Sequence, residues 1–146
     1  MQRTPLGYNP TQLGKVAGIQ DLALLKTEAD ASVIARMKTF KLATHRPQEG
    51  EKVTAIGLPG KEPFQERKTA EVNIVQGQFF TINVPLDPGY SGGVVLNESG
   101  EAYGFISSVT EKATTVYILD DKTLTRAKWV PYQGFSIPEG VPPPNQ

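Results

Sequence analysis

The stretch DPGYSGGVVLNESGEAYGFISS, residues 87–108, contains a serine in a glycine-rich turn, followed by a strand, a turn and a second strand. A serine hydroxyl is a weak nucleophile at neutral pH. It needs a base to take its proton and hydrogen-bond donors for the oxyanion that forms during attack. In this turn the N–H groups of Gly89 and Ser91 can point to one spot, and Gly92 and Gly93 tolerate unusual backbone angles. The stretch predicts a nucleophile turn around Ser91, while the same residues also fit a plain glycine-rich hairpin.

The composition of the chain excludes several classes of protein and of partner. The 146 residues suffice for one domain with its own core, and 15 basic against 15 acidic residues give no net charge. This balance argues against a nucleic-acid partner or a membrane surface held by bulk electrostatics. No apolar run approaches the roughly 20 residues of a membrane span, and the first residues lack the apolar core of a signal peptide, so the localisation is not indicated. The chain has no Cys and one His, so we expect neither an ordinary zinc site nor another metal or cofactor.

Many short elements are predicted from the 14 Gly and 12 Pro residues and from the spacing of the apolar residues. Strands are expected at 15–19, 22–26, 52–60, 70–75, 78–84, 93–96, 101–108 and 114–119, with a helical turn near 29–36, an extended piece at 40–43 and a short helix over 122–130. The polar stretch KEPFQERK, residues 61–68, is expected to be a loop. Several short strands with turn signals between them predict an all-β barrel or sandwich.

Three motifs together resemble those of the chymotrypsin-like (trypsin-fold) serine peptidases, especially compact bacterial and viral members related to the HtrA group. The motifs are DLALLK from Asp21, VTAIGLPG over 53–60, and GYSGG around Ser91 followed by the strand segment Gly104–Ser107. The resemblance covers residues 14 to about 119. It implies a chymotrypsin-like Greek-key β-barrel, complete in its second barrel, with the last strands of the first. It also implies Asp21 as the catalytic acid, Ser91 as the nucleophile, and the N–H groups of Gly89 and Ser91 as the oxyanion hole.

The histidine of the family's triad has no counterpart before the acid. In this family the histidine lies well upstream of the acid, whereas none of the residues before Asp21 is His. His45 follows the acid, in the segment that corresponds to the connection between the two barrels, and we interpret it as a linker residue. A rewired triad that uses His45 stays open, because triads are defined by geometry rather than by order. Three readings of the missing part also stay open: a split or processed peptidase, a degenerate fold kept for binding or assembly, and a sequence that starts internally.

The resemblance also implies a substrate-binding surface. The wall of the substrate pocket corresponds to Pro85 and Leu86, which carry no charge, so a small or medium apolar side chain is expected there. Ser107, Ser108 and Val109 correspond to the edge that pairs with the substrate backbone as an added strand. Tyr90 stands where many secreted members carry an Asp that pairs with a freshly cut N-terminus, and a tyrosine cannot form that pair.

These observations lead to one leading function and one alternative. The leading one is a trypsin-like serine endopeptidase, or the Ser-bearing C-terminal portion of one, that acts on a polypeptide and needs a His from another chain or a missing segment. The alternative is a catalytically inactive peptidase-fold protein with a binding or virion-structural role. The expected division is an arm, first-barrel remnant and linker over 1–45, the second barrel over 46–137 and a Pro-rich tail over 138–146. A second copy or another protein is expected to cover residues 14–26, whose apolar residues a two-stranded remnant cannot bury.

Overall fold

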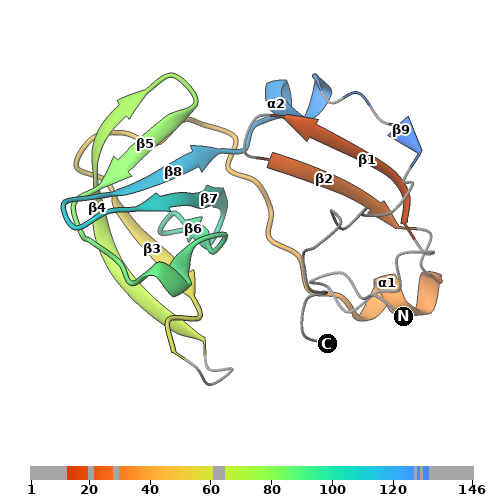
Figure 1. Cartoon of the computed structure of the whole chain (residues 1–146), viewed down its shortest axis with the longest axis horizontal. Coiled ribbons are helices and arrows are strands. Elements are labelled where there is room, and N and C mark those ends of the chain that lie inside the picture. The colour runs from red at the N-terminus through yellow and green to blue at the C-terminus, as the bar shows by residue number, and fades with distance from the viewer. Residues whose placement is uncertain are drawn as a thin grey trace, which may run out of the picture. The chain divides into compact units, whose positions relative to one another are not determined.

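The computed structural model describes residues 13–19, 22–27, 30–60, 65–126, 128, 130 and 131. Strands dominate this part of the chain, together with two short α-helices and a 3-10 turn (Figure 1). Residues 38–125 form one compact unit, and the remaining described residues belong to a second unit. The prediction of an all-β fold is confirmed. The predicted division at 45/46 stays a prediction, while the unit around the barrel begins at Lys38.

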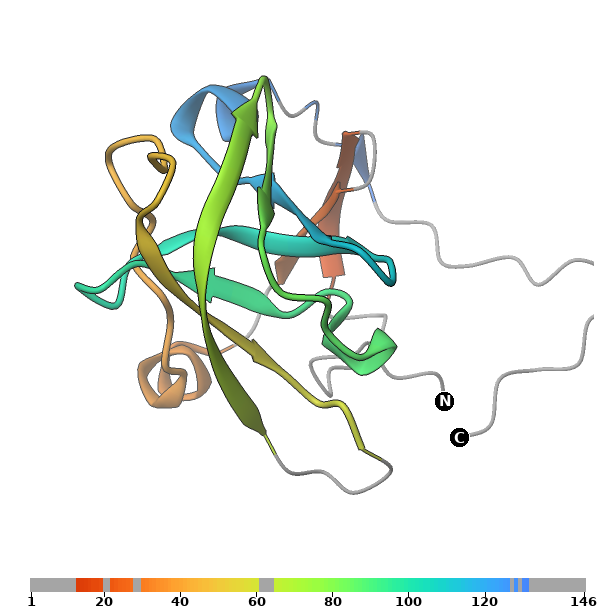
Figure 2. The ribbon, with the colours of Figure 1, turned by 90° about the vertical axis from the view of Figure 1, so that its left-hand side faces the viewer.

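Six strands of the larger unit close into a barrel in the order β3-β4-β5-β8-β7-β6, and each strand is antiparallel to its neighbours. Figure 2 shows these strands winding around the barrel axis. Closure leaves the barrel without a continuous open edge. The bounds are Lys52–Gly57 for β3, Glu66–Gln76 for β4, Phe79–Ile82 for β5, Val94–Leu96 for β6, Ala102–Val109 for β7 and Thr114–Ile118 for β8.

The barrel core follows from the alternation of side chains along each strand. On β3, Val53 and Ala55 point into the core, while Lys52 is exposed and Thr54 is half-buried. A strand with period-two alternation turns every second side chain to the same face, as Ala70 and Val72 on β4 and Phe80 and Ile82 on β5 do in this core. The other fully buried side chains of the core are Leu86, Tyr90, Val95, Tyr103, Ile106, Val116 and Ile118.

The hairpin of β4 and β5 is confirmed, but β4 starts earlier than the sequence predicts. Glu66, Arg67 and Lys68, which were expected in a polar loop, are the first residues of β4 and pair with the end of β3. Pairing with β3 gives this part of the backbone hydrogen-bond partners on one side, and the three side chains stay exposed, so the polar composition does not disfavour a strand here. Residues 61–64 of the same predicted loop lie outside the described residues.

The second unit contains a three-stranded antiparallel sheet in the order β2-β1-β9. Its strands are Leu13–Ile19 for β1, Leu22–Thr27 for β2 and Val130–Pro131 for β9, and the helix α1 spans Ala31–Arg36. The strands expected at 15–19 and 22–26 are confirmed, and so is the helical turn expected near 29–36. Within the described residues no helix is long and apolar enough to cross a membrane.

The helix predicted over 122–130 is shorter than expected. The helix α2 spans Asp121–Thr125, and Val130 belongs instead to β9, where it pairs with Val16. The start of α2 is capped by Asp120, whose Oδ1 accepts hydrogen bonds from the Thr123 N–H at 2.8 Å and the Thr123 hydroxyl at 2.7 Å. Burial raises the pKa of Asp120, but the hydrogen bonds from Thr123 outweigh burial and hold this pKa below its ordinary value.

Candidate active site

Ser91 lies at the end of a 3-10 turn that connects the barrel strands β5 and β6. This turn, η2, spans Pro88–Tyr90, and Ser91 follows it with an exposed side chain. The Gly92 N–H donates to the carbonyl of Ile106, and the Ile106 N–H donates to the carbonyl of Gly93, both at 2.8 Å. These two bonds attach the turn to β7. Within the described residues the Ser91 hydroxyl makes no hydrogen bond, so it is presented to solvent from a fixed backbone.

Two glycines of the turn are required by its geometry. Gly92 has a φ of +82°, a left-handed conformation that residues with a side chain rarely adopt. A Cβ at Gly93 would lie 2.1 Å from the carbonyl oxygen of Ile56, so the turn approaches β3 more closely than any side chain allows. The glycine pattern read from the sequence as a nucleophile turn therefore has a packing role against β3.

One of the two predicted oxyanion donors is already bonded within the turn. The Ser91 N–H donates to the carbonyl of Pro88 at 3.0 Å, which closes the 3-10 turn. The carbonyl of Gly89 accepts a hydrogen bond from the Leu58 N–H at 3.3 Å, which ties the turn to the end of β3. In this conformation an oxyanion beside Ser91 has to compete with Pro88 for the Ser91 N–H.

Tyr90 anchors the nucleophile turn from inside the barrel. Its side chain is fully buried, and a Cβ at Gly57 would lie 2.5 Å from its ring. The Tyr90 hydroxyl donates to a carboxylate oxygen of Glu66 at 2.6 Å. Burial raises the pKa of Tyr90 above its ordinary value, and the hydrogen bond to Glu66 raises it further. The residue before Ser91 is therefore a neutral, buried phenol that connects the turn to β4, a role that its sequence position did not reveal.

The predicted substrate-binding residues occupy two environments. Pro85 is exposed, whereas the Leu86 side chain is packed in the barrel core. Ser107 lies at a bulge of β7, and the next two residues, Ser108 and Val109, pair with β8 on one side. The pairing of β7 with β6 ends at Phe105, so Ser108 and Val109 extend past the end of β6. The substrate-binding role of these residues stays a prediction.

His45 is held at a different part of β7 from Ser91. Its Nε2 lies 3.0 Å from the Tyr103 hydroxyl, and its ring packs edge-on against the Tyr103 ring. The same hydroxyl donates to Glu51. Tyr103 precedes Ile106, to which the nucleophile turn is bonded, by three residues, which is about 10 Å along a strand. The geometry supports the interpretation of His45 as a linker residue fixed to the barrel.

The predicted acid lies outside the described residues. β2 begins at Leu22, directly after Asp21, so its role and its distance from Ser91 stay predictions. Among the described residues no group of three or more His, Asp or Glu side chains could hold a metal ion. The site that the structure describes therefore consists of the Ser91 turn and its neighbours on β3, β6 and β7.

Two of the cavities on the barrel unit bear on Ser91 and its surroundings. One of about 440 Å³ lies beside Ser91 and is lined by residues of the turn and of the end of β3, together with Phe40. A larger cavity of about 540 Å³ lies over β3 and β4, lined by Lys52, Arg67 and Glu98 among others, and Ser91 does not line it. Ser91 therefore lines the smaller of these two cavities, which was not predicted from the sequence because its lining combines Phe40 with residues near β3 and in the turn that lie far apart along the chain.

Comparison with known proteins agrees with the barrel fold. A protein-family profile described as "Trypsin-like peptidase domain" matches residues 2–105, which is more than half of the chain. The chain belongs to the trypsin-like peptidase family. No curated protein sequence matches it.

Solved structures of the same fold extend the comparison. Rv3671c from M. tuberculosis H37Rv, as a serine-to-alanine mutant in an inactive form, is similar over 78% of this chain and 63% of its own, with 15% identity and a TM-score of 0.59. The Rv3671c protease in an inactive form is similar over 70% of this chain and 60% of its own, with 16% identity and a TM-score of 0.55. The chain spans less than two thirds of these proteins, and identities this low show the fold alone.

Proposed function

We propose that this chain carries the nucleophile of a serine endopeptidase, either as the enzyme itself or as its Ser-bearing C-terminal portion. Ser91 attacks the carbonyl of a peptide bond, and the N–H groups of Gly89 and Ser91 stabilise the oxyanion. Asp21 orients a histidine that comes from another chain or from a segment outside this sequence. The histidine takes the Ser91 proton and delivers it to the leaving amine, so that the peptide C–N bond breaks and an acyl-Ser91 ester forms.

The observation that carries the proposal is the presentation of Ser91. Its exposed hydroxyl follows a 3-10 turn that two 2.8 Å backbone hydrogen bonds attach to β7. Tyr90, the residue before Ser91, is buried in the barrel and bonded to Glu66, which anchors the turn. A nucleophile must be exposed and held near its attack position, because misplacement lowers the rate steeply. The family membership supports the same reaction class.

The described conformation requires one rearrangement before catalysis. The Pro88 carbonyl has to release the Ser91 N–H, which it accepts at 3.0 Å, so that this donor can reach the oxyanion. A charged oxyanion forms stronger hydrogen bonds with N–H groups than a neutral carbonyl does, so its formation favours that change. The base is supplied from outside, because the only imidazole of the chain is bonded to Tyr103.

Labelling with a small alkyl fluorophosphonate tests the proposal without knowledge of the natural partner. The Ser91 oxygen forms a bond to phosphorus, fluoride leaves, and the proton goes to a base. We expect slow labelling of the chain alone and clearly faster labelling when free imidazole is added as a substitute base. Ser91→Ala is the control. Labelling that does not respond to imidazole, or that persists in Ser91→Ala, would contradict the proposed role of Ser91.

A second candidate is a peptidase-fold protein that binds or assembles without catalysis. It is favoured by the two polar contacts that occupy the reactive groups, the Ser91 N–H on Pro88 and His45 on Tyr103. In that case the turn is a structural corner of the barrel. The absence of any Ser91 adduct at saturating fluorophosphonate and imidazole, in a chain that melts cooperatively, would favour this candidate over the enzyme.

A further inference from the structure

The cavity beside Ser91 has an apolar, uncharged lining. Its side walls are formed by Phe40 and by Leu58 and Ile56 near the end of β3, and Val94 closes it on β6. Ser91 itself lines the cavity, and none of the lining residues that the structure describes carries a charge. Its volume of about 440 Å³ falls within the range of pockets that bind small ligands and side chains.

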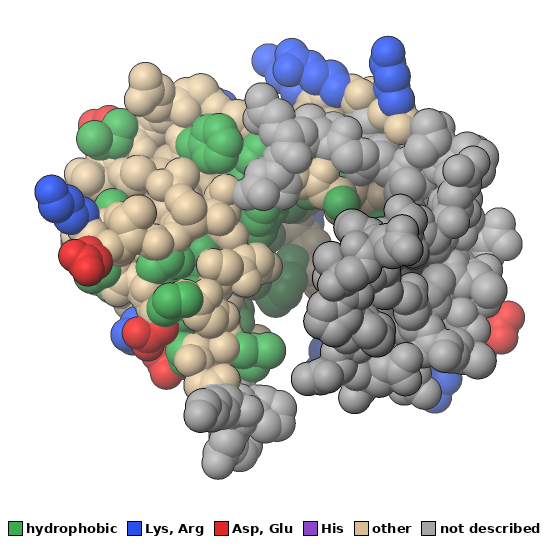
Figure 3. Space-filling model, viewed as in Figure 1, with side chains coloured by type: hydrophobic (Ala, Val, Ile, Leu, Met, Phe, Trp, Pro, Cys, Tyr) green, Lys and Arg blue, Asp and Glu red, His purple; other side chains and the backbone are tan. Residues whose placement is uncertain are grey.

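Two large apolar side chains at this cavity remain half in solvent. Phe40 is 50% exposed and Leu58 is 53% exposed. Apolar area left in water is a source of binding free energy once a partner covers it. On the face of the barrel unit drawn in Figure 3, the charged side chains stand in small groups rather than in one patch of a single sign. Hydrophobic contact, rather than charge, is therefore the chemistry that this cavity offers.

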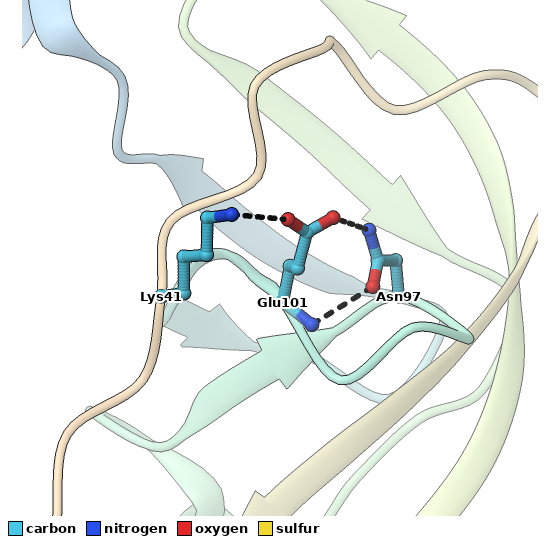
Figure 4. A network of polar contacts seen from close by, with 3 residues as sticks. All are labelled: Lys41, Asn97 and Glu101. Atoms are coloured by element: carbon cyan, nitrogen blue, oxygen red, sulfur yellow. Dashed lines mark hydrogen bonds and ion pairs between the residues drawn. The ribbon is translucent and has the colours of Figure 1, made fainter.

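Phe40 is held at the cavity by its neighbour in the chain. The carbonyl of Lys41 accepts a hydrogen bond from the Ala102 N–H at 2.8 Å, and the Ala43 N–H donates to the Ala102 carbonyl at 2.9 Å. Lys41 Nζ also lies 4.0 Å from the Glu101 carboxylate (Figure 4).

Asn97 fixes that carboxylate in turn. The Asn97 amide donates to Glu101 at 3.1 Å, and the Asn97 side-chain carbonyl accepts the Glu101 N–H at 2.9 Å, as Figure 4 shows. On the opposite wall, the hydrogen bond from the Leu58 N–H to Gly89 fixes Leu58. Both walls are thus attached to the barrel before any ligand binds, which reduces the ordering cost of binding.

The strand order places the cavity on one side of Ser91 and the predicted backbone-pairing edge on the other. β6, which follows the turn, pairs with β3 on one side and with β7 on the other. The cavity lies over the end of β3, whereas Ser108 and Val109 belong to β7. A polypeptide whose acyl part pairs with Ser108 and Val109 continues past Ser91 toward the β3 side. The residue beyond the scissile bond then meets the cavity.

We propose that the cavity lined by Phe40 and Leu58 binds an apolar, uncharged side chain on the leaving-group side of the polypeptide that Ser91 attacks. This inference rests on the proposed function. It names a second specificity-determining surface, separate from Pro85 and Leu86. Polypeptides with Lys, Arg, Asp or Glu at that position are disfavoured, because the lining offers their charges no partner and burying an unpaired charge is costly.

Binding of leaving-group fragments tests the inference without any catalytic step. The probes are three dipeptide amides, Leu-Ala, Lys-Ala and Asp-Ala, titrated into the Ser91→Ala chain while backbone amide shifts are followed by NMR. We expect the Leu-Ala amide to bind at least about tenfold more tightly than the Lys-Ala and Asp-Ala amides. Its binding should change the backbone amide chemical shifts of Leu58 and Gly93. Equal affinity for all three, or shifts confined to other residues, would overturn the inference.

Variants of the walls sharpen the test. Leu58→Ala and Phe40→Ala should each lower the affinity for the Leu-Ala amide about threefold to tenfold, whereas Ile74→Ala should leave this affinity unchanged. Ile74 is the matched control, because it is 52% exposed on β4 and does not line the cavity. Leu58→Lys should reverse the preference toward the Asp-Ala amide, and no reversal would overturn the inference. Fluorophosphonate labelling of the unsubstituted chain tests the proposed function separately, so equal affinity for the three amides together with imidazole-assisted labelling of Ser91 would overturn this inference and leave the proposed function standing.

Discussion

The Ser91 N–H and the Pro88 carbonyl lie 3.0 Å apart, and their hydrogen bond closes the turn that carries the exposed serine. The hydroxyl proposed as nucleophile and one of the two N–H groups proposed to stabilise the oxyanion belong to the same residue. In the described conformation the hydroxyl is available and the N–H is not. Any account of catalysis by this chain therefore includes a change at the Pro88–Gly89 peptide.

Gly89 is the position where that change is most sensitive to substitution. A Cβ at Gly89 would lie 2.4 Å from the Leu58 carbonyl oxygen and 2.6 Å from the Pro59 Cα, and neither backbone atom can move freely. Gly89→Ala should lower the free energy of unfolding by about 1–3 kcal/mol and slow imidazole-assisted labelling at least about tenfold. Urea unfolding and labelling rates measure the two effects. Ser99→Ala, in an exposed turn, is the control, and wild-type labelling in Gly89→Ala would contradict the assigned geometry.

His45 should be dispensable for Ser91 reactivity. Its imidazole is bonded to Tyr103, on the part of β7 that precedes the attachment of the nucleophile turn. His45→Ala should leave the rate of imidazole-assisted labelling unchanged within about twofold, because the imidazole is bonded to Tyr103 and lies outside the Ser91 turn. A large loss of labelling without a change in the thermal melt would instead place His45 in a rewired triad.

Two buried phenols make the stability of the barrel sensitive to alkaline pH. Burial raises the pKa of Tyr90 and of Tyr103, and hydrogen bonds to Glu66 and Glu51 respectively raise them further. A raised folded-state pKa means that the stabilisation is complete below the unfolded pKa, near 10, and is lost as the pH rises above it. Thermal melts from pH 8 to 11.5 should show a falling melting temperature above about pH 10, less steep in Tyr90→Phe. A flat profile to pH 11.5 would be the contrary result.

The cap of α2 contributes to the stability of the fold in the opposite way, because its contribution is lost at acidic pH. Hydrogen bonds from Thr123 hold the pKa of Asp120 below its ordinary value in spite of burial. Its stabilisation is therefore present above the unfolded pKa, near 4, and is lost as the pH falls through the folded pKa. Asp120→Ala should cost about 1 kcal/mol at pH 7 and less at pH 2.5, measured by urea unfolding.

Asp30 offers the matched control for that cap. It stands at the corresponding place before α1, but its side chain makes no capping hydrogen bond. Asp30→Ala should change the free energy of unfolding by less than about 0.5 kcal/mol at either pH. Equal effects of the Asp120 and Asp30 substitutions would contradict the assignment of the cap.

The barrel and the nucleophile turn could be predicted because their signals are local. Val53 and Ala55 alternate with polar neighbours, and the Gly-Tyr-Ser-Gly-Gly turn follows from the backbone that glycines permit. The start of β4 was missed because Glu66–Lys68 carry charged side chains, and only pairing with β3 makes them a strand.

The features of the site that escaped prediction depend on contacts between distant parts of the chain. Tyr90 bonds to Glu66, which precedes it by 24 residues, and His45 contacts Tyr103, which follows it by 58 residues. No local pattern encodes such pairs. The predicted partner over residues 14–26 stays a prediction as well, with β2 at one end of its sheet and Leu25 38% exposed.

Peptide mapping by mass spectrometry after fluorophosphonate labelling in the presence of imidazole tests the central claim most directly. The account predicts one phosphonyl group for each folded chain, located on Ser91 and on no other hydroxyl, and prior unfolding in urea should abolish the adduct. An adduct on another serine, threonine or tyrosine of the folded chain, or equal modification of Ser91 in the folded and unfolded chain, would contradict it.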